Sequence, residues 1–218
     1  TDRRQRQMCI RDRVEGYPSI AEVRKEPHQQ YNIGGNWHTD HSYDQIPALG
    51  SMLYAKELPK VGGDTLFAGC AAAFDTLSEG MKSTLRSLRA VHSSRHVFGK
   101  SAAIPDDMAD LFGNADKALQ DAEHPVVIKH PLSGRETLYV NPGFTTRFVG
   151  WTEKESNSLL AFLYEHISRP EHTYRFQWSK GALAFWDNRA TWHLAVNDYP
   201  GETRLMHRIT IEGEPLEP

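Results

Sequence analysis

Four short apolar segments follow one another closely in the C-terminal part of the sequence, and they constrain the fold more than any other feature. They are residues 173–178, 182–186, 191–196 and 204–211. Short runs of this kind, bounded by Gly, Pro, Asn and Asp, predict β-strands. Because many short strands alternate with only a few helices, we expect a mixed α/β, mainly β fold. It would be organised as a β-barrel or jelly roll with helical insertions rather than as a doubly wound sheet.

Earlier segments add further strands and two helices to this prediction. Apolar residues recur every three or four positions across residues 71–92, which indicates a helix. A second helix is expected at residues 152–168, because Thr152 and Glu155 have capping-box spacing and Pro170 ends the pattern. Other extended runs are expected at residues 32–40, 50–56, 65–67, 126–129 and 137–140.

The size and charge of the chain exclude several classes of protein. Its 218 residues suit one globular domain, and no apolar run approaches the roughly 18 residues that a membrane span needs. A formal net charge of −3 gives no overall attraction to nucleic acid or to an anionic membrane. The two cysteines, Cys9 and Cys70, cannot build a disulfide framework, which favours a cytoplasmic protein.

Two polar segments interrupt the expected domain. Residues 1–13 carry five arginines and two aspartates, a charge of +3, which leaves −6 for the rest of the chain. We interpret this segment as a disordered or non-native leader, the alternative being a basic arm for nucleic acid or membranes. The segment from about residue 95 to 122 is polar and interrupted by glycine and proline, which predicts a lid or surface insertion.

Metal chemistry is suggested by the tetrapeptide Trp37-His38-Thr39-Asp40. On a strand, residues two apart share a face, so His38 and Asp40 would project together. A second imidazole from His193 would complete a two-His, one-carboxylate triad, which leaves three positions open on ferrous iron. Alone, the His-x-Asp pair is common enough to be a surface pair without a ligand role.

Arginines on the last predicted strand suggest a site for anions. If residues 197–201 form a tight turn centred between Asp198 and Tyr199, His193 faces Arg204 across a hairpin. By alternation, one face of this strand carries Arg204, Met206, Arg208 and Thr210. Two guanidinium groups beside a metal would bind carboxylates or similar anions. The alternative is that both arginines lie on the outer face and pair with surface acids.

Five sequence blocks, in order and at matching spacings, carry a family resemblance. They are NWHTD at 36–40, GGDTLF at 62–67, NPGFTTRF at 141–148, WDNRATWH at 186–193 and RLMHRITIEGE at 204–214. The chain resembles the taurine dioxygenase and 2,4-dichlorophenoxyacetate dioxygenase (TauD/TfdA) family of Fe(II)- and 2-oxoglutarate-dependent dioxygenases. The resemblance implies a double-stranded β-helix (jelly roll) core within residues 14–218, truncated at its N-terminal side.

The same resemblance implies the roles of individual residues. It assigns His38, Asp40 and His193 as ligands of Fe(II), and Thr65 and Arg204 as the residues that hold 2-oxoglutarate. It implies that 2-oxoglutarate and O2 are consumed, with release of succinate and CO2, while the substrate is hydroxylated. By resemblance, Arg208 lies near the anionic group of the substrate or near the cofactor.

The substrate is less constrained by the sequence. We expect a small organic anion: a taurine-like sulfonate, a sulfate ester or an aryloxyalkanoate. Tyr17 and Asn36 are candidate contacts, and Phe144 is either a wall of the substrate site or a core residue. No nucleic-acid or membrane partner is expected, and a homo-oligomer is left open. Two alternative functions are a zinc metallohydrolase that uses the same triad and a truncated fragment without catalytic activity.

Overall fold

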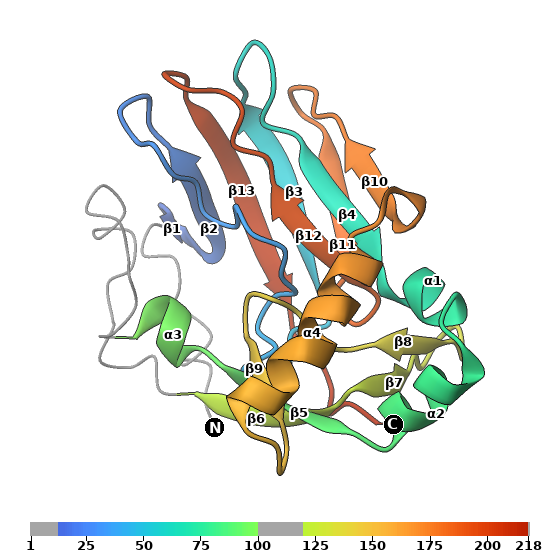
Figure 1. Cartoon of the computed structure of the whole chain (residues 1–218). Helices are drawn as coiled ribbons and strands as arrows, with labels where there is room; N and C mark the ends of the chain where they lie inside the picture. Colours follow the sequence, from blue (N-terminus) through green and yellow to red (C-terminus); the bar gives the residue numbers. More distant parts are fainter. Residues whose placement is uncertain (1–12, 100–119, 218) are drawn as a thin grey trace.

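The computed structural model describes residues 13–99 and 120–217 (Figure 1). Its largest sheet has five antiparallel strands in the order β1-β2-β13-β3-β11. Their bounds are Arg13–Val14 (β1), Tyr17–Lys25 (β2), Arg204–Ile211 (β13), Gly50–Glu57 (β3) and Leu183–Asp187 (β11). The sheet joins the two ends of the described chain, because β13 lies between β2 and β3.

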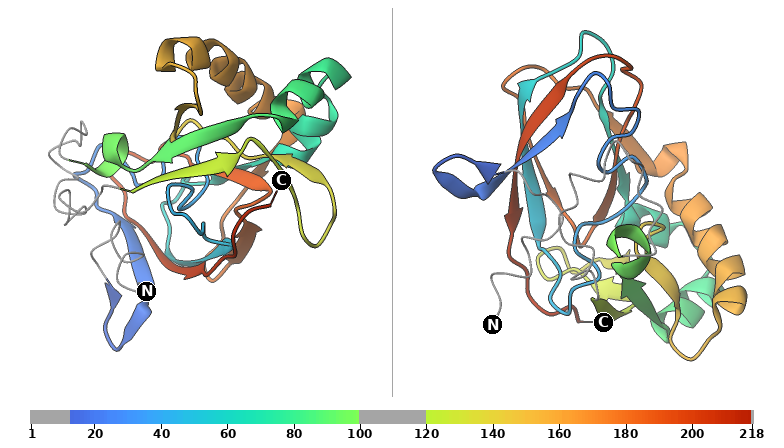
Figure 2. Two further views of the ribbon diagram at one scale, coloured as in Figure 1. Left: turned by 90° about the horizontal axis from the view of Figure 1, so that it is seen from below. Right: turned by 90° about the vertical axis from the view of Figure 1, so that its left-hand side faces the viewer.

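A smaller antiparallel sheet faces the first. It contains β10 (Thr173–Phe176), β4 (Thr65–Gly69) and β12 (Thr191–Ala195), in that order. Figure 2 shows the two sheets as separate layers. An apolar cluster fills the space between them: Leu53, Ala55, Ala184, Trp186 and Met206, with Phe67, Phe176 and Trp178 packed against it. Inward and outward side chains alternate along each strand, so one face of each sheet contributes to this interior.

Helices and short strand pairs gather at one end of the two sheets, at the bottom of Figure 1. The helices are α1 (Cys70–Asp75), α2 (Glu79–Arg86), α3 (Arg95–Phe98), α4 (Glu153–Ile167) and the 3-10 turn η4 (Pro170–His172). The strands are β5 (Arg89–Ser93), β6 (Asp121–Pro125) and β9 (Thr145–Phe148) in one sheet, and β7 (Val127–Lys129) and β8 (Glu136–Leu138) in another. Trp192 from the smaller sheet packs into a second core cluster with Phe74 and Leu163.

The mixed α/β, mainly β prediction is confirmed, and most expected strands are present. The helix expected at residues 71–92 is wrong: Ser78 caps a new helix, α2, so the segment contains α1, α2 and then β5. Residues 32–40 form turns with a single bridge at His38 rather than a strand.

Of the two polar segments, residues 1–12 and 100–119 lie outside the described residues, whereas Arg13 belongs to β1 and residues 121–122 to β6. Within the described ranges, no helix is long and apolar enough to span a membrane.

Helix α4 begins with the capping box that the sequence predicts. Thr152 accepts a hydrogen bond from the Glu155 backbone N–H at 3.3 Å, and the Glu155 carboxylate accepts one from the Thr152 backbone N–H at 2.8 Å. We expect Thr152→Ala to lower the free energy of unfolding by about 0.5–2 kcal/mol, because the Glu155 backbone N–H loses its acceptor. Urea denaturation would measure the change. Thr152→Ser keeps the hydroxyl and should stay near the parent protein, so an equal loss in both variants would contradict the capping explanation.

Candidate metal centre

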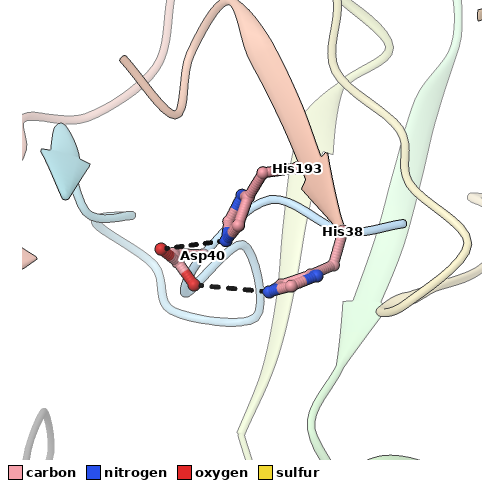
Figure 3. A group of neighbouring side chains, drawn as sticks. All are labelled: His38, Asp40 and His193. Carbon is pink, nitrogen blue, oxygen red and sulfur yellow. Dashed lines mark ion pairs between the residues drawn. The ribbon is translucent and has the colours of Figure 1, made fainter. Parts of the chain in front are cut away.

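Three side chains converge on one point at the interior face of the smaller sheet. His38 Nε2 lies 3.6 Å from Asp40 Oδ1, and His193 Nε2 lies 3.6 Å from Asp40 Oδ2 (Figure 3). The three ligand atoms that His38, Asp40 and His193 offer lie within 4.8 Å of one another. Two imidazole nitrogens and a carboxylate on one side of a centre suit ferrous iron and leave its other positions free.

A backbone bridge brings the two histidines together. His38 N–H donates to the His193 carbonyl at 3.1 Å, and His193 N–H donates to the His38 carbonyl at 2.9 Å. The Thr39 hydroxyl, which lies within 2.7 Å of the Asn188 carbonyl and 3.1 Å of the Thr191 carbonyl, ties the next residue to the same region. The strand expected around His38 and Asp40 is therefore wrong, yet the pair still converges because β12 holds His38 in place.

Charge and hydrogen bonds keep the Asp40 carboxylate ionised. Burial by itself favours the protonated acid, but the neighbouring Arg208 guanidinium, with smaller contributions from His193 and His38, holds the pKa of Asp40 well below its usual range. Arg208 Nη2 lies 2.8 Å from Asp40 Oδ2, and the Ser51 hydroxyl donates to the same oxygen at 2.7 Å. An ionised, oriented carboxylate is the form that binds a metal.

Both histidines present the Nε2 edge of the ring to Asp40. Burial, followed by the repulsion from His38, lowers the pKa of His193 well below its usual range, so this imidazole is neutral. His38 Nδ1 lies 2.8 Å from the Asn36 carbonyl, which can only accept, so Nδ1 donates and Nε2 is the ring nitrogen that faces Asp40. Asn36, which the sequence suggests as a substrate contact, orients His38 through its backbone.

The ring of His38 sits in a close-fitting environment. Phe144 is buried and meets it edge-to-face, with ring centroids 6.2 Å apart. A Cβ added to Gly143 would lie 2.8 Å from the His38 Cβ, so only glycine fits there. Phe144 therefore belongs to the core and at the same time forms a wall beside the triad. Tyr17, the remaining expected substrate contact, is 63% exposed at the start of β2 and paired with β1 through Val14.

Ser51 is a residue of the site that the sequence interpretation missed. It opens the inward face of β3 with Leu53 and Ala55, and it is fully buried. We expect Ser51→Ala to weaken Fe(II) binding about tenfold, because Asp40 loses a hydrogen bond that fixes its orientation. Anaerobic calorimetric titration would measure the affinity.

The matched control for this prediction is Ser156→Ala. Ser156 is also fully buried, but its hydroxyl bonds the backbone of Thr152 and Phe148 in the other core cluster. We expect this variant to lose stability and keep its Fe(II) affinity. Equal Fe(II) affinities in the Ser51 variant and the parent would mean that Asp40 is held without the serine.

A second polar group lies between the sheets, on β13 and β4. Arg204 is 4% exposed, and its Nε donates to the Gly63 carbonyl at 2.9 Å. Its Nη2 is buried and has no hydrogen-bond partner among the described residues. Burial lowers the pKa of this guanidinium, and Tyr199 and Asp64 offset only part of that decrease. A buried cation with an unused donor is costly unless an anion completes it, so this position fits a carboxylate.

Arg204 reaches this position by a route that differs from the predicted hairpin. The pairing of His193 with Arg204 is wrong: β12 pairs with β4, whereas β13 pairs with β2 and β3 in the other sheet. The segment between the strands crosses from one sheet to the other instead of closing a tight turn. The alternation within β13 is confirmed, because Arg204 and Met206 are buried and Arg208 reaches Asp40.

Thr65 completes this polar group. It is buried at the start of β4, the central strand of the smaller sheet, and its Oγ1 accepts a hydrogen bond from Trp178 Nε1 at 3.0 Å. Gly63, which binds Arg204, precedes it by two residues and has a positive φ of 70°. The Gly62-Gly63 turn thus places a hydroxyl and a guanidinium in one region, and Thr65 lies two residues along β4 from Phe67, which pairs with His193.

The chain is similar in sequence to known proteins. The sequence is 38% identical over 182 residues to an alkylsulfatase of Acinetobacter baylyi, an alignment that covers 82% of this chain and 57% of that protein. It is 37% identical over 183 residues to an alpha-ketoglutarate-dependent sulfate ester dioxygenase of Pseudomonas putida, covering 82% and 60% respectively. The chain therefore spans less than two thirds of the length of these two relatives.

The structure also resembles a solved one. A crystal structure of a taurine dioxygenase from Burkholderia xenovorans superposes with a TM-score of 0.75 at 35% identity, covering 93% of this chain and 67% of that one. The model of the family described as taurine catabolism dioxygenase TauD, TfdA matches residues 4–210. This match covers all three residues of the triad, and it shows that the chain belongs to the TauD/TfdA dioxygenase family.

Proposed function

We propose that the protein is an Fe(II)- and 2-oxoglutarate-dependent dioxygenase that hydroxylates a small organic anion. The observation that carries the proposal is the triad of His38, Asp40 and His193 together with a buried Arg204, whose Nη2 has no hydrogen-bond partner among the described residues. The triad alone would also suit zinc in a hydrolase. That alternative gives no task to the Arg204 guanidinium, which needs an anion, whereas 2-oxoglutarate supplies a carboxylate.

Each residue has a defined task in this proposal. His38, Asp40 and His193 would hold Fe(II), and Arg208 and Ser51 keep Asp40 ionised and oriented toward it. Arg204 and Thr65 would bind the distal carboxylate of 2-oxoglutarate through a charge-assisted and a neutral hydrogen bond. When bound, iron and 2-oxoglutarate supply the O2 chemistry that releases succinate and CO2 and hydroxylates a C–H group of the substrate.

We propose sulfate esters as the first substrate class to test, followed by sulfonates and aryloxyalkanoates. Support comes from the alkylsulfatase and sulfate ester dioxygenase relatives. Arg208 is our candidate for binding the anionic group of the substrate, because its Nε is buried and has no hydrogen-bond partner among the described residues. Phe144 would form an apolar wall, and Asn36 and Tyr17 stay predictions as contacts. Hydroxylation of the carbon that bears the sulfate gives an unstable adduct, which breaks down to an aldehyde and sulfate.

Anaerobic titration of the protein with Fe(II) and then 2-oxoglutarate tests the proposal. We expect one equivalent of each to bind and a visible charge-transfer band to appear only when both are present. Folded protein that binds Fe(II) but never 2-oxoglutarate would refute the dioxygenase assignment. Binding of both without succinate release across the substrate panel would favour a truncated, inactive fragment.

Three further proposals concern the whole molecule. We propose that the five-stranded and three-stranded sheets are the two halves of a double-stranded β-helix, or jelly roll, supported by their facing arrangement and shared apolar interior. We propose that residues 14–218 belong to the dioxygenase domain, and Arg13 in β1 and the family match from residue 4 indicate that part of the preceding segment belongs to it as well. A cytoplasmic location and the oligomeric state stay predictions, which cell fractionation and light scattering would test.

A further inference from the structure

Trp178 contacts both residues that we propose bind 2-oxoglutarate. Its indole Nε1 donates a hydrogen bond to Thr65 Oγ1 at 3.0 Å. The Arg204 guanidinium carbon lies 5.9 Å from the centroid of its ring. Phe176 meets the same ring edge-to-face, with centroids 4.7 Å apart, and holds it against the interior of the sheets. One side chain therefore connects the neutral donor and the charged donor of the carboxylate site.

The direction of the Trp178 hydrogen bond decides what Thr65 can do. An indole N–H can only donate, so Thr65 Oγ1 is the acceptor in this pair. The hydrogen of the Thr65 hydroxyl is then directed away from the indole and is available to donate to another group. A carboxylate oxygen is the strongest acceptor for such a donor.

The backbone at Thr65 is already fixed, which leaves the hydroxyl as the one adjustable part. Thr65 pairs with Phe176 of β10 on one side and with Ala195 of β12 on the other. A hydroxyl without a neighbouring donor rotates freely and loses that freedom when a ligand binds. A hydroxyl that is oriented beforehand binds the ligand more tightly, because the ordering is complete before binding.

We infer that Trp178 is a positioning residue for the cosubstrate, acting through Thr65. Its indole N–H orients the Thr65 hydroxyl as a donor to the distal carboxylate of 2-oxoglutarate, beside Arg204. The inference rests on the proposed function, since it needs 2-oxoglutarate to be the ligand. Trp178 affects the affinity for the 2-oxoacid and leaves the metal ligands unchanged.

The variant Trp178→Phe removes the indole N–H and keeps an aromatic ring. We expect 2-oxoglutarate to bind the Fe(II)-loaded protein about three- to tenfold more weakly, the effect of one neutral hydrogen bond, in anaerobic calorimetry. Fe(II) affinity and the kcat at saturating 2-oxoglutarate should stay unchanged, while the KM for 2-oxoglutarate rises. The matched control is Trp151→Phe, because Trp151 packs on Phe148 in the other core cluster.

A double-mutant cycle with Thr65→Val separates positioning from general loss of structure. If Trp178 acts through the Thr65 hydroxyl, Trp178→Phe should have no further effect on 2-oxoglutarate affinity once that hydroxyl is gone. Additive effects, or an unchanged affinity in Trp178→Phe, would overturn the inference while the proposed function stands. A parent protein that binds Fe(II) but no 2-oxoglutarate would refute the proposed function and the inference together.

Discussion

Replacing His193 by alanine is expected to weaken Fe(II) binding more than about 100-fold and to abolish succinate formation. Even residues that only support metal ligands cost 10- to 100-fold when they are lost, so removal of a ligand should cost more. His193 is well suited to the role, because it is buried and neutral and its Nε2 faces Asp40. Metal analysis after anaerobic dialysis would measure retained iron, and succinate release would measure turnover.

The control for this prediction is His207→Ala. His207 lies on β13 between two inward-facing residues, and its own side chain points the other way and pairs with Glu22 at 3.4 Å. It should keep both iron and activity. His193→Gln preserves most of the buried volume, so a folded Gln variant that has lost iron would separate ligation from packing. A His193→Ala protein with the parent affinity for Fe(II) would show that the triad is not the metal site.

Replacing Arg204 by methionine is expected to weaken 2-oxoglutarate binding by roughly 10- to 150-fold, with little change in Fe(II) affinity. The variant removes a charge-assisted hydrogen bond to a carboxylate, worth about 1.5–3 kcal/mol. Methionine keeps the apolar stem of the side chain, which limits the packing loss inside the sheets. Calorimetric titration of the Fe(II)-loaded protein with 2-oxoglutarate would give the affinity.

Arg204→Lys provides the matched comparison. Lysine keeps the charge but lacks the planar group that binds a carboxylate through two nitrogens, so its effect should be intermediate. Both variants leave the Gly63 carbonyl without its present donor, and thermal unfolding should be recorded alongside. Equal losses of Fe(II) and 2-oxoglutarate affinity in Arg204→Met would mean that the arginine supports the fold rather than the cosubstrate.

Local signals made part of the fold predictable from sequence. Helix α4 starts at a capping box and ends before Pro170, and each of these features depends on residues within a few positions of one another. The helix expected at residues 71–92 failed because its apolar spacing continues through a break. Only the structure reveals that Ser78 caps a second helix and that residues 89–93 pair with β6 and β9.

The candidate site could be predicted from the sequence only for residues that lie at characteristic spacings along the chain. Block spacing predicted the triad and Arg204 as site residues. The hairpin that was expected to pair His193 with Arg204 does not form, because their strands belong to different sheets. The alternation of buried residues along β3 could have indicated that Ser51 points inward, because Ser51 shares a face with Leu53 and Ala55. No spacing connects Trp178 with Thr65, because that contact depends on how β10 lies beside β4.

The backbone bridge between His38 and His193 determines when the triad can assemble during synthesis of the chain. During synthesis, the first two residues of the triad leave the ribosome long before the third, and Arg204 and Arg208 follow later still. A nascent chain that stops short of β12 holds only His38 and Asp40, without the neighbour whose backbone fixes His38. Domains generally fold as units as they emerge. The complete triad can therefore assemble only after β12 has been synthesised and has bridged to His38.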